Sequence, residues 1–148
     1  MADNDLKVET QLEINKSCAV VFEAIINPEQ MSCYFITSGS GRLDAGQPVT
    51  WSFADHGDAT LTVTPLHIES DCKVVFSWNA TGSETRVAID LELCDSGTTI
   101  VKVCESGWPL SKDGASKALM QMQGWMHMLC CLKAYLEFQI NLRVGADK

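Results

Sequence analysis

Apolar and polar residues alternate along several short stretches of the chain. In residues 6–14, apolar residues and a threonine occupy every second position and Lys, Glu or Gln the others, and residues 85–94 repeat this alternation. A period of two indicates a strand with one buried face. Other stretches alternate less regularly and are also typical of strands. The pattern therefore predicts a weak strand within 37–46 and further strands at 6–14, 49–53, 59–68, 73–78, 85–94 and 99–105.

A helical period replaces this alternation in two places. Ser17 precedes an apolar-rich run at 18–26 and is a favoured N-cap residue, and Pro28 ends the run, with a further short turn predicted at 28–33. Residues 113–142 contain no proline and predict one long helix. Its apolar stripe repeats at steps of three and four. The stripe consists of Met122, Trp125, Leu129, Leu132 and Leu136.

The order of these elements predicts the architecture. Consecutive strands joined by short turns form an antiparallel meander, which the sequence Gly107-Trp108-Pro109 is expected to end. Only the long C-terminal helix is available to cover most of one sheet face. We therefore expect an α+β fold in which a curved antiparallel sheet of six to seven strands grips this helix, with one or two short helices after the first strand. Such curvature commonly leaves a space under the helix.

The last hairpin allows a prediction of register. A loop at residues 96–98 pairs Leu93 with Val101 and Leu91 with Val103, which keeps apolar side chains on one face. A slip by one residue would exchange the two faces and place a charge among the apolar residues. The pattern therefore favours the three-residue loop over a two-residue one.

Length, charge and cysteine content limit the class of protein. The 148 residues are expected to form a single domain, 1–148. The formal net charge of -8 disfavours nucleic acid and anionic membranes as partners. The acidic N-terminus lacks the features of a secretory signal, and no window approaches the roughly 18 apolar residues of a membrane span. Seven cysteines without a CxxC pair indicate reduced thiols and a cytoplasmic protein.

Several local motifs resemble one known family. They are VVFEAI at 20–25 followed by NPE at 27–29, VFSW at 75–78, TRV at 85–87 with GTT at 97–99, ESG at 105–107, and GW at 124–125 with LKAYLE at 132–137. In this order they resemble the AHSA-type family, named for activators of the ninety-kilodalton heat-shock protein ATPase. That family belongs to the START-like (SRPBCC, Bet v-like) superfamily, and the resemblance covers about residues 8–142. It implies the helix-grip fold.

Catalytic and metal-binding signals are absent from the sequence. No serine lies in a nucleophile elbow, no Cys and His residues have zinc-site spacing, and no phosphate-binding loop occurs. Asp55, His56 and Asp58 are expected to form a solvated turn rather than a metal site. We therefore predict no catalytic residue, no metal and no cofactor, and we favour a protein that is not an enzyme.

Aromatic and methionine side chains suggest a ligand cavity instead. Strands, a loop and the long helix should bring them around the space under the helix, where they suit an apolar or aromatic ligand, although filling of the core explains them equally well. Candidate polar contacts are Tyr34, Arg86 and His127. The predicted cavity lining comprises Trp51, Phe53, Phe76, Trp78, Leu91, Val103, Trp108, Met122, Trp125 and Leu129.

Three functions are compatible with this sequence. The first is a binding module for a small hydrophobic molecule, with lipid binding included. The resemblance implies two others: a co-chaperone-like partner of the heat-shock ATPase in the stress response, and an enzyme similar to the polyketide cyclases of the superfamily. A monomer and a homodimer are both compatible with the pattern.

Overall fold

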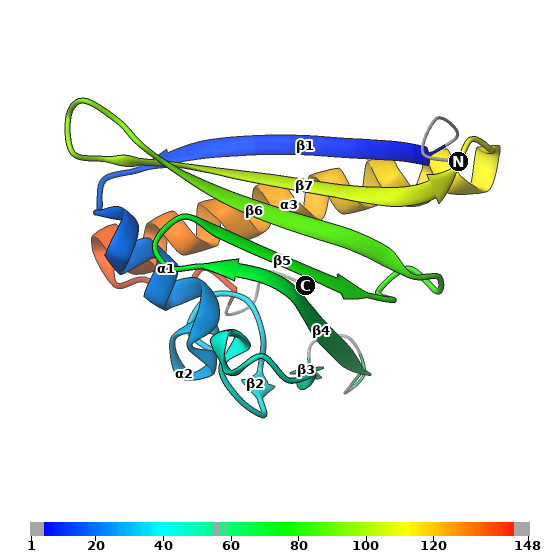
Figure 1. The fold of residues 1–148 in the computed structure, drawn as a ribbon, viewed down its shortest axis with the longest axis horizontal. Coiled ribbons are helices and arrows are strands. Elements are labelled where there is room, and N and C mark those ends of the chain that lie inside the picture. The colour runs from blue at the N-terminus through cyan, green and yellow to red at the C-terminus, as the bar shows by residue number, and fades with distance from the viewer. Residues whose placement is uncertain (1–4, 55–56, 58, 144–148) are drawn as a thin grey trace.

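A single antiparallel sheet organises the protein. The computed structural model describes residues 5–54, 57 and 59–143, and in it the sheet has seven strands in the order β1-β7-β6-β5-β4-β3-β2. Neighbours in sequence are neighbours in the sheet, except that β1 pairs with β7 (Figure 1). The strands are β1 (Asp5–Ile14), β2 (Ser38–Gly39), β3 (Val49–Phe53), β4 (Ala59–Glu69), β5 (Lys73–Trp78), β6 (Thr85–Leu93) and β7 (Thr99–Pro109).

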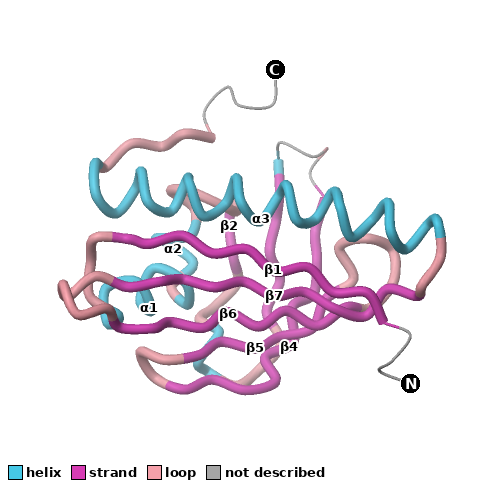
Figure 2. Tube along the Cα trace, turned by 90° about the horizontal axis from the view of Figure 1, so that it is seen from above, coloured by secondary structure: helices cyan, strands magenta, loops and turns pink. Residues whose placement is uncertain are grey.

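The long helix α3 (Lys112–Phe138) covers the sheet from one side. It packs along β1 and β7, and Figure 2 shows it running alongside β1 for most of its length. The short helices α1 (Cys18–Ile26) and α2 (Pro28–Met31) follow β1, and the 3-10 helix η2 (Leu43–Ala45) precedes β3. This is the α+β, helix-grip-like fold that the sequence predicts.

Polar caps define where the helices begin. The Ser17 side chain accepts a hydrogen bond from the backbone N–H of Val20, and Ser111 does the same at the start of α3 by accepting from Gly114. Such caps satisfy backbone donors that have no partner within the helix. The prediction that Ser17 begins the first helix is therefore confirmed.

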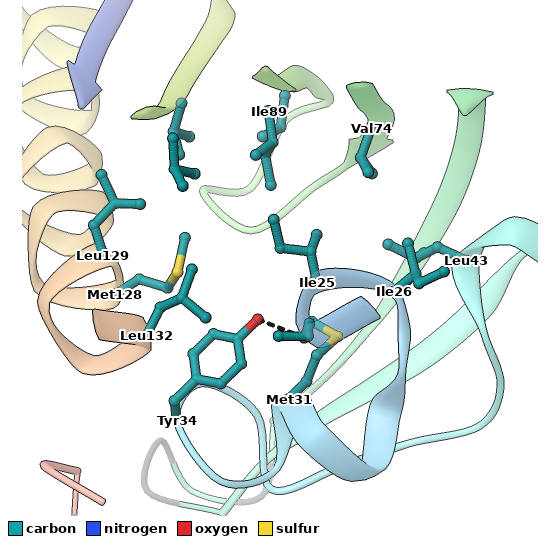
Figure 3. Packing of buried hydrophobic residues seen from close by; sticks show 14 of the residues in the cluster. Ile25, Ile26, Met31, Tyr34, Leu43, Val74, Ile89, Met128, Leu129 and Leu132 are labelled. Carbon is teal, nitrogen blue, oxygen red and sulfur yellow. Dashed lines mark hydrogen bonds between the residues drawn. The ribbon is translucent and has the colours of Figure 1, made fainter. Parts of the chain in front are cut away.

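The apolar core lies where α1, α2 and α3 meet the inner face of the sheet. Figure 3 shows Ile25 of α1, Leu132 of α3 and Ile89 of β6 directed toward one another. Tyr34 is buried at the edge of this cluster, where its hydroxyl donates a 2.8 Å hydrogen bond to the carbonyl of Ala24. Burial also raises the pKa of Tyr34, so this hydroxyl stays a donor.

Strand β7 is longer than the sequence indicated. Gly107 does not end it, because the register against β1 shifts there: Leu6 pairs with Trp108 while Lys7 pairs with Ser106. Gly107 is the extra residue of this bulge, and its φ of 123° is one that side-chain-bearing residues rarely adopt. The bulge lets the strand continue to Pro109, and it buries Trp108 although the alternation alone would turn that residue outward.

The predicted register of the last hairpin was wrong by two residues. Leu91 pairs with Val101 and Leu93 with Thr99, not with Val103 and Val101. The loop does contain three residues, but they are 95–97, closed by a hydrogen bond from the Cys94 N–H to the carbonyl of Thr98. Gly97 takes the left-handed conformation (φ 82°) that ends a three-residue hairpin loop.

Glu137 fixes the last turn of α3 to the end of β1. Its carboxylate accepts hydrogen bonds from the Asn15 N–H at 2.8 Å and from Lys133 at 2.6 Å. Burial alone raises the pKa of Glu137, but these two donors outweigh it and hold the pKa below the ordinary value of 4.5.

We predict that Glu137 makes folding stability depend on acid pH. A lowered carboxyl pKa contributes stability above its unfolded value, and this contribution is lost as the pH falls through the folded value. Urea unfolding measured between about pH 6 and about pH 3 should therefore show a smaller loss of stability in Glu137→Gln than in the wild type. Glu92→Gln, at an exposed position, should follow the wild type. Identical pH profiles for Glu137→Gln and wild type would contradict the prediction.

Candidate ligand-binding cavity

A cavity of about 410 Å³ lies between the β3–β5 part of the sheet and α3. The cavity opens to solvent. Its wall is formed by strands β3–β5, by α3, by the segment after α2 and by Arg143 at the end of the described residues. The lining residues are Phe35, Phe53, Ala59, Leu61, Trp78, Ala80, Gln121, Gly124, Trp125 and Arg143.

The cavity has an aromatic floor and a mouth bordered by small residues. Phe53, Trp78 and Trp125 are buried, and the two indole rings stack with their centroids 5.5 Å apart. Ala59 and Ala80 are exposed. Because these two side chains are no larger than a methyl group, they leave access to the aromatic floor.

Helix α3 presents one narrow face to the cavity. Gln121, Gly124 and Trp125 stand at positions i, i+3 and i+4, which share a face of a helix. Close packing does not explain a glycine within this helix, because a Cβ atom at Gly124 would meet nothing within 4 Å. The missing side chain instead keeps the mouth of the cavity open, at a cost of about 1 kcal/mol relative to alanine.

Behind the cavity wall lies a fully buried carboxylate, that of Glu105 on β7. One of its oxygens accepts hydrogen bonds from Trp78 Nε1 (3.0 Å) and Thr85 Oγ1 (2.5 Å). The other accepts from Gln121 Nε2 (2.9 Å) and Trp125 Nε1 (2.7 Å). All four partners donate, which is the arrangement that a carboxylate, an acceptor at both oxygens, requires. The network therefore fixes three of the residues that line the cavity.

Sequence reasoning did not identify Glu105 as part of the site, although the alternation contains a signal. Val101, Val103 and Glu105 are spaced by two and share the inner face of β7, so a glutamate stands where the pattern calls for an apolar residue. A buried carboxylate needs donors from neighbouring elements. The pairing of Trp78 with Thr85 across β5 and β6 brings two of them to it.

The structure brings three of the ten predicted lining residues to the cavity: Phe53, Trp78 and Trp125. Trp108 is buried elsewhere and donates from Nε1 to Thr81, and Met122 is 43% exposed. Contact between a ligand and any of the ten predicted residues stays a prediction. The other five are buried in the apolar core and do not line the cavity: Trp51, Phe76, Leu91, Val103 and Leu129.

None of the three candidate polar contacts lines this cavity. Arg86 and His127 are exposed, and Tyr34 lines a second, smaller cavity of about 280 Å³. The turn with Asp55, His56 and Asp58 lies outside the described residues. The lining residues that the sequence analysis did not name as site residues are Phe35, Ala59, Leu61, Ala80, Gln121, Gly124 and Arg143.

Arg143 connects the two cavities. It lines both, its Nε donates a 2.9 Å hydrogen bond to the carbonyl of Tyr34, and its guanidinium carbon lies 5.5 Å from the centre of the Phe35 ring. A cation over an aromatic face is attracted to it. Phe35 in turn contacts the rings of Phe53 and Trp125, so this contact extends to the cavity floor.

Comparison with known proteins gives the family. Residues 15–137 match the family described as Activator of Hsp90 ATPase homolog 1-like protein. The chain belongs to this AHSA1 family. A search of the curated proteins found no significant match to it.

Solved structures agree with the AHSA1 fold. SSP2350 from Staphylococcus saprophyticus is 28% identical, with a TM-score of 0.81 over 93% of this chain and 96% of that one. DynU16, in the dynemicin biosynthetic locus, is 21% identical with a TM-score of 0.78, over 90% of this chain and 48% of that one. The Aha1 dimer from Colwellia psychrerythraea is 18% identical with a TM-score of 0.73, over 90% and 97%.

Other chemistry in this AHSA1 chain is limited. Within residues 5–54, 57 and 59–143, no three His, Cys, Asp or Glu side chains gather as a metal site would require. Burial raises the pKa of the Cys104 and Cys131 thiols, which disfavours the nucleophilic thiolate. In the described part of the chain no helix has the length and apolar character needed to cross a membrane.

We predict that Glu105→Gln destabilises the protein by at least about 2 kcal/mol. Each carboxylate oxygen receives one indole N–H, so either orientation of the new amide sets its NH₂ group against a donor that cannot accept. Urea unfolding would measure the loss. Glu9→Gln, at an exposed position on β1, should change stability by less than about 0.5 kcal/mol. An equally small effect at both positions would show that the network is not needed for stability.

Proposed function

We propose that this protein binds a small hydrophobic or aromatic molecule in the cavity under α3. The observation that carries the proposal is a cavity that opens to solvent and has the rings of Phe53, Trp78 and Trp125 in its lining. Water against such a surface is displaced favourably by an apolar ligand, at about 25 cal/mol for each Å² of apolar area buried.

The dimensions and chemistry of the cavity support a ligand rather than a filled core. Its volume of about 410 Å³ lies within the roughly 300–1,000 Å³ of typical small-molecule sites. Such sites are mostly apolar with a few polar groups that orient the ligand. Here the indole N–H groups of Trp78 and Trp125 both donate to Glu105. The remaining lining residues with polar side-chain groups are Gln121 and Arg143.

Native mass spectrometry of protein purified from its own host tests the proposal directly. A bound molecule at one copy per chain would appear as a mass increment that is lost on gentle denaturation. The expected result is an apolar or aromatic compound whose binding to the emptied protein changes the fluorescence of the floor tryptophans. A clean mass together with a thermal-shift screen of apolar compounds that shows no binding would overturn the proposal. The co-chaperone-like function would then be the one to test, by pull-down with the chaperone.

We predict that Ala80→Trp blocks the mouth of the cavity. Ala80 is exposed, so a tryptophan there should leave the core intact while its ring covers the opening. Affinity for a ligand found in the screen should fall at least about tenfold, or about 1.4 kcal/mol, measured by fluorescence titration. Ser83→Trp changes the same turn outside the lining and should bind as the wild type does. Equal affinity in both variants would place the ligand elsewhere.

We predict opposite effects on stability and binding at Gly124. Gly124→Ala should stabilise the protein by about 0.5–1 kcal/mol, because alanine favours the helix and no atom obstructs its Cβ. The same methyl group narrows the mouth, so ligand affinity should fall, and Gly124→Leu should lower it further. Gln123→Ala is the control on an exposed position outside the lining. Unchanged affinity in both Gly124 variants would mean that the ligand does not approach this part of α3, and a gain in affinity would contradict the narrowing of the mouth.

A further inference from the structure

The two polar atoms of the Gln121 side-chain amide differ in their hydrogen bonding. Its Nε2 donates to Glu105, and no donor within residues 5–54, 57 and 59–143 reaches its Oε1. The other lining side chains are apolar, indole or guanidinium groups, so Gln121 supplies the lining's side-chain hydrogen-bond acceptor.

Glu105 determines which way this amide faces. A carboxylate oxygen can accept from the NH₂ group of Gln121 but has nothing to donate to its carbonyl oxygen. The Glu105 oxygen that accepts from Gln121 also accepts from Trp125 Nε1 at 2.7 Å. The amide is therefore held with Nε2 toward Glu105, which leaves Oε1 as the group that a bound molecule can meet.

The same hydrogen bond strengthens Oε1 as an acceptor. Hydrogen bonds in a chain polarise one another, and a donor group engaged by an anion makes the acceptor at the other end of the amide more electron-rich. The buried charge of Glu105 also disfavours a negative charge placed against this part of the wall. A neutral hydrogen-bond donor on the ligand avoids this repulsion and can use the strengthened acceptor.

We propose that the ligand is an aromatic molecule that carries a neutral hydrogen-bond donor, a hydroxyl or N–H group, and that it donates to Gln121 Oε1. This inference rests on the proposed function, since it specifies the class of molecule that the cavity takes. The rings of the ligand lie on the floor of Trp78 and Trp125 and its donor reaches the α3 wall. Gln121 is thereby a residue that determines specificity.

A matched set of two-ring compounds tests this assignment by isothermal titration calorimetry at neutral pH. The set consists of 2-naphthol, which can donate, 2-methoxynaphthalene, which cannot, and 2-naphthoate, which is an anion. Wild-type protein should bind 2-naphthol about three- to tenfold more tightly than the methyl ether, which is the range expected for one net hydrogen bond. In Gln121→Met this preference should shrink to within about twofold. Gln123→Met, outside the lining, should keep it.

The outcomes separate this inference from the function on which it rests. Equal binding of naphthol and its methyl ether to the wild type overturns the inference and leaves the cavity as a binding site. Tighter binding of naphthoate, unchanged in Gln121→Met, also overturns it, because Arg143 would then select an anion. Failure of all three compounds to bind overturns the inference, and the native mass and the thermal-shift screen then decide whether the cavity binds a ligand at all. If Gln121→Met does not fold, as its circular dichroism would show, the wild-type comparison alone decides.

Discussion

The burial of one carboxylate is the constraint on which this structure depends. Glu105 has no exposed surface, and its four hydrogen-bond partners come from β5, β6 and α3 while it stands on β7 itself. Removing such a group from water costs several kcal/mol unless its lone pairs are satisfied. The favourable arrangement is therefore the one in which these elements meet in a single register, so the carboxylate ties the position of α3 to the sheet.

The same network explains how a cavity persists beside a closely packed core. Trp78 and Trp125 would gain contacts by tilting into the open space, but each indole N–H is held by Glu105. Trp78 also packs on further rings, since Trp51 and Phe76 contact it edge to face. Both rings are thus held in place where they line the cavity. A preorganised floor of this kind reduces the ordering cost of binding an apolar ligand.

Membership of the AHSA1 family accounts for the fold, and the cavity's chemistry comes from residues placed on that fold. The small residues at the mouth, the aromatic rings at the floor and the glutamine come from β3, β4, β5, the turn after β5 and α3. The helix contributes through a short face, Gln121 to Trp125, whereas its C-terminal half, with Leu129 and Leu132, fills the core. One helix therefore provides both a binding wall and the main packing surface.

The sequence by itself determined the elements, their order and which strand face is buried, because these depend on local periodicity and caps. It could not determine the register of β6 and β7: a shift of two residues leaves every side chain on the same face, so the alternation is equally satisfied, and the left-handed turn at Gly97 decides. Local pattern likewise placed Met122 in the apolar stripe, yet the sheet does not cover it. Only the tertiary structure brought Glu105, Gln121 and the two indoles together, because hydrogen bonds between residues 16 to 27 positions apart depend on how the strands and α3 pack.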